Sequence, residues 1–177
     1  MLGRFFPGRQ NKGHKTAIKI IEKLVSSIPQ VHLTMIGNVH PNKASKLYVQ
    51  ELKDMVKSKL LPVSFAINAS PKVIEWHLRN SLVVWHLTGI EQADVAYQKK
   101  LVPLFGIQVE DEIEDPASYE HFGIALVEAM NSGCIPIALN KGGVTEIISD
   151  KVNGYLVGNS REVVTLYIIH IVYNMLR

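Results

Sequence analysis

The stretch EHFGIALVEAMNSGCIPIAL, residues 120–139, decides the fold. Its first half predicts a helix over residues 122–131, and its second half predicts a strand over residues 135–139. A helix that leads into an apolar strand is the unit of a parallel sheet with helices on both faces. We therefore look for the same alternation in the rest of the chain.

Apolar runs and helix-period segments do alternate on both sides of this stretch. The predicted strands cover residues 2–6 (a stub), 31–37, 63–67, 82–87, 135–139 and 154–157. The predicted helices cover residues 14–28, 43–59, 71–79, 122–131, 144–149 and a closing segment from residue 161. This order predicts an α/β fold, a single Rossmann-like domain over residues 1–177 whose mostly parallel sheet is flanked by helices.

One interval breaks the pattern. Residues 88–119 show no clear period, so they are predicted to form a long loop, and long loops inside compact domains are often functional. The acidic run at 110–115 could imitate a metal site, but a solvated loop is the favoured interpretation.

Composition excludes several classes of protein. The net charge of +3 comes from 19 basic and 16 acidic side chains, and no basic run suggests nucleic-acid binding. The single cysteine, Cys134, excludes an internal disulfide and is predicted to be a buried structural thiol. We find no signal peptide and no apolar stretch of membrane-spanning length, so a cytoplasmic setting is expected.

Every loop that carries polar chemistry follows a predicted strand. These loops cover residues 4–12, 68–70, 86–120 and 140–143. Ligands of parallel sheets bind at the carboxyl ends of the strands, so the loops predict one common site.

Two carboxylates stand out, because Glu120 precedes the helix that starts near residue 122 and Glu128 lies inside it, eight residues later. The helix N-terminus at Gly123, Ile124 and Ala125 offers free N–H groups to an anion. A carboxylate at Glu128 can bind the vicinal diol of a ribose. On spacing alone, a non-functional interpretation is favoured, in which Glu120 is a charge at the helix terminus and Glu128 is a solvated helix residue.

The surrounding residues shift that balance. Residues 120–130 resemble the E-x7-E motif of retaining glycosyltransferases of the GT-B fold, family 4. The wider resemblance adds GRFF at 3–6 with Asn11-Lys12, WHLTG at 85–89, SGCIP at 132–136 and GGVTEI at 142–147, in the family's order and spacing.

The resemblance implies a role for each matching residue. Arg4 and Lys12 correspond to the basic pair that holds the donor diphosphate, so neither a metal nor another cofactor is expected. The amides at Gly123 and Ile124 correspond to those that contact the distal phosphate, and Ala125 is assigned to the donor site beside them. Glu128 holds the ribose, and Glu120 lies near the transferred sugar, where it supports an oxocarbenium-like transition state. Asn68 and Ser70 lie where the family places its base-binding loop.

His86 ends a strand that faces the same site. Contact with the sugar or a phosphate and a purely structural role are equally open for this side chain. The histidines at 14, 32, 40, 77 and 170 are interpreted as structural.

The chain departs from the family by matching only the second, donor-binding domain. A fragment is favoured over a half-protein that works with a partner chain. The acceptor, a glycan or lipid-linked molecule, is expected to bind through the missing N-terminal domain. Peripheral association of the apolar closing helix with a membrane is a further option.

Three functions compete. Retaining sugar transfer from a nucleotide sugar is favoured, and a non-catalytic nucleotide-sugar-binding or interaction module is the alternative. A dinucleotide-dependent oxidoreductase fails, because no G-x-G-x-x-G follows the first strand and Gly37-Asn38 stands where an acid should end the second.

Overall fold

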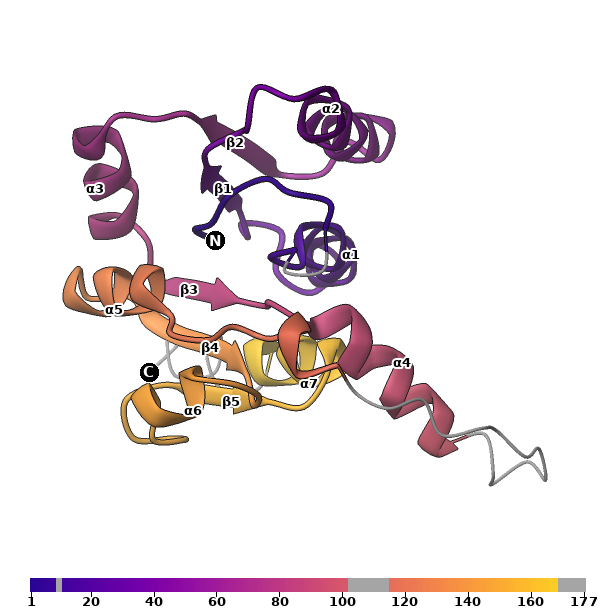
Figure 1. Ribbon diagram of the computed structural model, residues 1–177, viewed down its shortest axis with the longest axis vertical. Coiled ribbons are helices and arrows are strands. Elements are labelled where there is room, and N and C mark those ends of the chain that lie inside the picture. The colour runs from indigo at the N-terminus through magenta and orange to yellow at the C-terminus, as the bar shows by residue number, and fades with distance from the viewer. Residues whose placement is uncertain (9–10, 102–114, 169–177) are drawn as a thin grey trace.

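The computed structural model describes residues 1–8, 11–101 and 115–168, and these carry an α/β fold with two parallel sheets (Figure 1). The first sheet pairs β1 (Leu33–Gly37) with β2 (Val63–Ile67). The second has the order β3-β4-β5, with bounds Val83–His86, Ile135–Leu139 and Tyr155–Val157. The predicted α/β class with parallel pairing is confirmed.

The amino-terminal segment extends the first sheet. The predicted strand stub at residues 2–6 is reduced to two isolated parallel bridges, Leu2 with Ile36 and Phe5 with Val39. Hydrogen bonds on this side run from Gly3 N to the Ile36 carbonyl and from Phe5 N to the Asn38 carbonyl, both at 2.9 Å. The segment therefore runs alongside β1, and the loop after Phe5 starts at the carboxyl end of the sheet.

Seven α-helices lie within the described residues: α1 (His14–Leu24), α2 (Lys43–Ser58), α3 (Pro71–Arg79), α4 (Ile90–Leu101), α5 (Ile124–Asn131), α6 (Val144–Ile147) and α7 (Ser160–Leu166). The predicted starts of α1, α2, α3 and α6 are confirmed. Helix α1 ends at Leu24, four residues before the predicted end. Helix α5 starts two residues later than predicted, because Gly123 has a left-handed, non-helical backbone and is its N-cap.

The second sheet buries side chains on both faces. Successive strand residues point to opposite sides, so Trp85 and Ile137 join one core cluster while Val84 and Ala138 join the other. The first cluster includes α1 and α7, and the second includes α5 and α6. Helices on both faces of this sheet are what the alternating sequence pattern predicts.

The predicted loop at 88–119 is wrong over its first part, because α4 occupies Ile90–Leu101. Over residues 90–98, whose burial the structure describes, Ile90 and Ala93 are buried and Val95 is exposed, so this part of the helix carries only a narrow apolar stripe. An apolar stripe that narrow gives no 3.6-residue period. A short 3-10 turn follows at Pro116–Ser118. Most of the acidic run lies outside the described residues.

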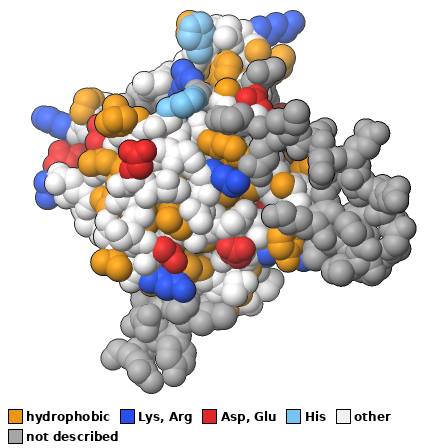
Figure 2. All heavy atoms as spheres, turned by 60° about the horizontal axis from the view of Figure 1, so that its bottom comes forward, with side chains coloured by type: hydrophobic (Ala, Val, Ile, Leu, Met, Phe, Trp, Pro, Cys, Tyr) orange, Lys and Arg blue, Asp and Glu red, His pale blue; other side chains and the backbone are white. Residues whose placement is uncertain are grey.

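The thiol of Cys134 is buried, as predicted. Its Sγ donates to the carbonyls of Leu78 and Ser81, at 3.2 and 3.4 Å, so it joins β4 to the end of α3. In the described ranges, no helix is long and apolar enough to cross a membrane. Figure 2 shows one face on which acidic, basic and apolar side chains intermingle among the described atoms.

His14 is structural, as predicted, and it makes folding sensitive to pH. Its ring is 1% exposed and stacks on Phe5 at 4.7 Å, with the Tyr48 ring 5.9 Å away. Among the described atoms its Nδ1 has no hydrogen-bond partner. Burial first, then the nearby amino terminus and Lys12, lowers the pKa of His14 from 6.5 to about 3.

Stability is therefore expected to fall as the pH drops from 6.5 towards 3. In that window the unfolded chain binds a proton at His14 and the folded chain does not, which costs up to about 1.4 kcal/mol per pH unit. Urea unfolding between pH 6.5 and 5 measures the slope. In His14→Gln the slope should shrink, and an unchanged slope would show that His14 titrates normally in the folded protein.

Candidate active site

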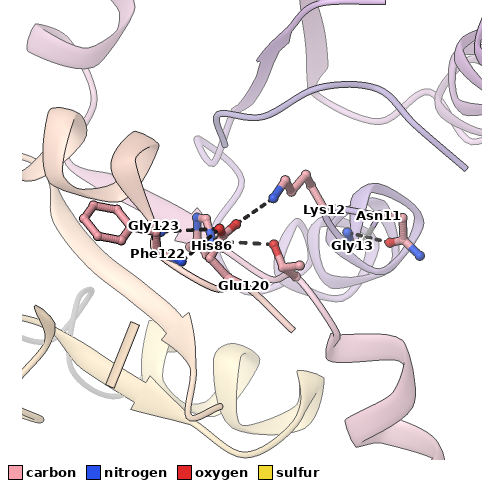
Figure 3. Close-up of polar contacts among 8 residues, drawn as sticks. Asn11, Lys12, Gly13, His86, Glu120, Phe122 and Gly123 are labelled. Atoms are coloured by element: carbon pink, nitrogen blue, oxygen red, sulfur yellow. Dashed lines mark hydrogen bonds and ion pairs between the residues drawn. The ribbon is translucent and has the colours of Figure 1, made fainter. Parts of the chain in front are cut away.

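Three segments far apart in the sequence meet at one carboxylate. Lys12 comes from the loop before α1, His86 from the end of β3, and Glu120 from the segment before α5 (Figure 3). The Lys12 Nζ lies 2.6 Å from the Glu120 Oε2, and the His86 Nε2 lies 3.1 Å from the same oxygen. The structure therefore brings these three of the predicted site residues together.

The other oxygen of Glu120 faces the start of α5. The backbone N–H groups of Phe122 and Gly123 point to Glu120 Oε1 at 3.4 and 3.3 Å. The pKa of the Glu120 carboxyl is held well below its usual value, foremost by the hydrogen bond with His86 and next by Lys12, while burial opposes the shift. An ionised carboxylate therefore occupies the helix N-terminus where an anion was predicted to bind.

His86 belongs to this cluster through its contact with Glu120, and its assignment as a donor-binding residue stays a prediction. Its side chain is buried, and the hydroxyl of Thr88 lies 3.5 Å from the same Nε2. Because an ionised carboxylate can only accept hydrogen bonds, the Nε2 of His86 carries the proton that it shares with Glu120.

The Gly142-Gly143 turn packs against the backbone of Glu120 and His121. Gly143 N donates to the Glu120 carbonyl at 2.8 Å. A Cβ atom at Gly142 would collide with that carbonyl, and one at Gly143 would collide with the carbonyl of His121. Glycine is therefore needed at both positions for this turn to pack against the Glu120 segment.

Glu128 lies apart from the Lys12 cluster. It is exposed on α5 and lines a groove of about 530 Å³, together with residues of α3 that include Pro71, Ile74 and Arg79. Ile124 is exposed at the first turn of α5, and Ala125 is half-buried beside it. Pro71 directly follows the predicted base-binding loop, so the groove extends from Glu128 to the residue next to that loop.

Arg4 does not share the contacts of Lys12. Its side chain is exposed, and its guanidinium lies over the Phe6 ring, 5.5 Å from the centroid. Asn68 has a left-handed backbone with φ 51°, and its Oδ1 accepts from Val39 N at 2.9 Å. This bond ties the loops after β1 and β2 together. Ser70 precedes α3 and is exposed.

A second cavity, of about 610 Å³, lies at the amino ends of β1 and β3, beside Trp76 and Tyr167. None of the described residues that line it belongs to the predicted site. Within the described part of the chain, no group of three or more His, Cys, Asp or Glu side chains could hold a metal ion.

Solved structures with the same fold are glycosyltransferases. The C-terminal domain of a glycosyl transferase group 1 family protein from Francisella tularensis has a TM-score of 0.66 at 24% identity, over 99% of this chain and 76% of that one. Anabaena HepE in complex with UDP-glucose has a TM-score of 0.65 at 22% identity, over 98% of this chain and 39% of that one. The fold is that of a GT-B glycosyltransferase domain.

Residues 115–170 match the family described as glycosyl transferases group 1. This segment includes Glu120, the start of α5, Glu128 and the Gly142-Gly143 turn. A shorter likeness links the chain to sucrose synthase 5 of Oryza sativa subsp. japonica, 51% identical over 49 residues, and to sucrose synthase 5 of Arabidopsis thaliana, 50% identical over 40 residues. The matches span 27% and 23% of this chain but only 6% and 5% of those enzymes. Together these findings support the group 1 family.

Sequence reasoning assigned no role to two side chains that lie beside these residues. Thr88 was quoted within WHLTG at 85–89 but received no role of its own, since it stands at the start of the interval without a clear period. Glu91 was hidden by the same gap in the pattern, although its carboxylate accepts from the Asn11 side chain at 3.1 Å. Asn11 was noticed only as the neighbour of Lys12.

Proposed function

We propose that this chain binds a nucleoside diphosphate sugar and that its fold supports transfer of the sugar to an acceptor with retention at the anomeric carbon. One observation carries the proposal: Lys12, His86 and the N–H groups at the start of α5 all converge on the carboxylate of Glu120. Donors for a diphosphate and a carboxylate for a sugar are thereby held at one point.

The chemistry needs both signs of charge. When the bond between the sugar and the diphosphate breaks, negative charge grows on the leaving phosphate and positive charge grows on the sugar ring. Lys12 and the helix N-terminus offset the first, and Glu120 offsets the second. Arg4 is the proposed second cation for the diphosphate, and the cationic pair would serve without a metal.

The relatives support a nucleotide sugar as the ligand. HepE has been solved with UDP-glucose and with UDP, and sucrose synthases share the short matched segment. This chain spans 39% of HepE, so we propose that a glycan or lipid-linked acceptor is recognised by residues beyond these 177. Action in the cytoplasm, at the cytosolic face of a membrane, is part of the same proposal.

Calorimetric titration with UDP-glucose, GDP-mannose and ADP-glucose tests the proposal. We expect one of them to bind the unchanged chain. Glu128→Ala should weaken that binding about 10- to 100-fold, because hydrogen bonds from the ribose hydroxyls to a charged acceptor are lost. Glu146→Ala is the matched control, since Glu146 is an exposed glutamate on α6 that lines no part of the α3–α5 groove.

Failure of all three nucleotide sugars to bind would overturn the proposal. Equal losses of nucleotide-sugar affinity in Glu128→Ala and Glu146→Ala would show that Glu128 does not contact the ligand. Turnover with added glycan or lipid-linked acceptors separates an enzyme from a module that only binds the nucleotide sugar.

A further inference from the structure

The loop that carries Lys12 is held from the side opposite Glu120. Asn11 uses both ends of its side-chain amide: Oδ1 accepts from Gly13 N at 2.8 Å, and Nδ2 donates to the Glu91 Oε2 at 3.1 Å (Figure 3 shows Asn11 and Gly13). The first bond closes a turn around Lys12. The second ties that turn to the first turn of α4, 80 residues away in sequence.

A second contact joins the same two segments. Gly13 has φ 73°, and a Cβ atom built on it would lie 2.7 Å from the Leu87 carbonyl and 2.9 Å from the Ile90 Cγ2. The loop backbone therefore rests directly on the segment between β3 and α4. Ile90 is fully buried and anchors this segment. Glu91, the next residue, is therefore fixed in position where it accepts the hydrogen bond from Asn11.

We propose that Glu91, acting through Asn11, is a positioning residue that fixes Lys12 for the donor diphosphate. This inference rests on the proposed function. Lys12 lies between the two tethered residues, Asn11 and Gly13. Its methylene groups lie against Gly3, and its ammonium contacts Glu120. The three contacts define one direction for a long side chain that is otherwise costly to order.

The tether matters most when a donor is bound. The diphosphate would share the ammonium of Lys12, so Glu120 alone would no longer fix that side chain. Asn11 and Glu91 lie on the far side of the loop and would keep their contacts. Preorganisation of this kind lowers the cost of binding rather than adding a contact to the ligand.

The test compares Glu91→Ala with Glu91→Gln, Lys12→Ala and the double variant Glu91→Ala/Lys12→Ala. With UDP as the probe, and with GDP and ADP where UDP does not bind, Glu91→Ala should weaken binding about three- to tenfold. Glu91→Gln should bind as the unchanged chain does, because its amide oxygen still accepts from Asn11. In the Lys12→Ala background, loss of Glu91 should cost nothing further, since the two act as one unit.

A ligand-free measurement accompanies the titrations. Amide hydrogen exchange at Gly13 should speed up in Glu91→Ala and stay slow in Glu91→Gln, because the Gly13 N–H depends on Asn11. Glu51→Ala is the matched control, since it removes a nearby carboxylate that pairs with Lys15 instead.

Additive losses in the double variant, or no rescue by glutamine, would overturn the positioning role while the proposed function stands. Failure of UDP, GDP and ADP to bind the unchanged chain would instead contradict the proposed function itself. Equal effects of Glu51→Ala and Glu91→Ala would show a general charge effect and would also overturn the inference.

Discussion

Replacing Glu120 by glutamine should strongly reduce sugar transfer and, at the same time, tighten binding of the free nucleoside diphosphate. The carboxylate now occupies donors that a diphosphate needs, namely Lys12 and the N–H groups of Phe122 and Gly123. A neutral amide no longer repels the phosphate. The gain should be about fivefold or more, since like charges about 4 Å apart cost about 1 kcal/mol even in water.

Transfer should fall in the same variant by at least about 100-fold, because the charge that we propose stabilises the sugar in the transition state is gone. The measurements are calorimetric titration with UDP, GDP and ADP and a transfer assay with acceptor present. Glu146→Gln, on the exposed side of α6, should change neither quantity. Weaker binding of the free diphosphate in Glu120→Gln would refute the view that the carboxylate competes for the phosphate donors.

Lys12→Ala should weaken binding of nucleotide sugar and nucleoside diphosphate alike, about 10- to 100-fold, since one charge-assisted hydrogen bond to phosphate is lost. The variant also leaves the Glu120 carboxylate without its cation in a setting where both side chains are less than a fifth exposed. Folding stability should therefore drop by about 1–3 kcal/mol, measured by urea unfolding at pH 7.

The sign of the pH dependence adds a second check on Lys12. The pKa of Glu120 is depressed in the folded protein, so its contribution to stability is present above the unfolded pKa and is lost as the pH falls through the folded pKa. That acid-side loss should be smaller in Lys12→Ala. Lys15→Ala is the control, because Lys15 lies in the first turn of α1 and pairs with Glu51 at the surface. An equal loss of ligand binding in both variants would deny Lys12 a specific role.

Much of the fold was predictable because its buried strands and amphipathic helices carry strong periods. The bounds of β2, β4 and α3 agree with the predicted bounds, since each is framed by residues with clear turn or capping chemistry, such as Pro71 at the start of α3. Helix α4 could not be found this way. Over residues 90–98, whose burial the structure describes, the buried residues are Ile90 and Ala93, so the sequence there resembles a loop.

The site was predictable only in part. The loops after the strands identify Lys12, His86 and Glu120 as neighbours, because parallel strands bring their carboxyl ends to one edge. The contact between Glu120 and Lys12 depends on side-chain directions across 108 residues of sequence, which no local pattern contains. The same holds for Asn11 and Glu91. Arg4, assigned beside Lys12 by resemblance, stays a prediction, since its described contact is with Phe6.

The separation in sequence between the site residues has a thermodynamic consequence. Lys12, His86 and Glu120 are joined by contacts that span 108 and 34 residues, so the unfolded chain contains no partial version of the site. A ligand that binds there binds only the folded state, and its binding free energy adds to the folding free energy. At a ligand concentration 100 times the Kd this linkage amounts to about 2.7 kcal/mol, a large share of the 5–15 kcal/mol or so that holds typical domains folded.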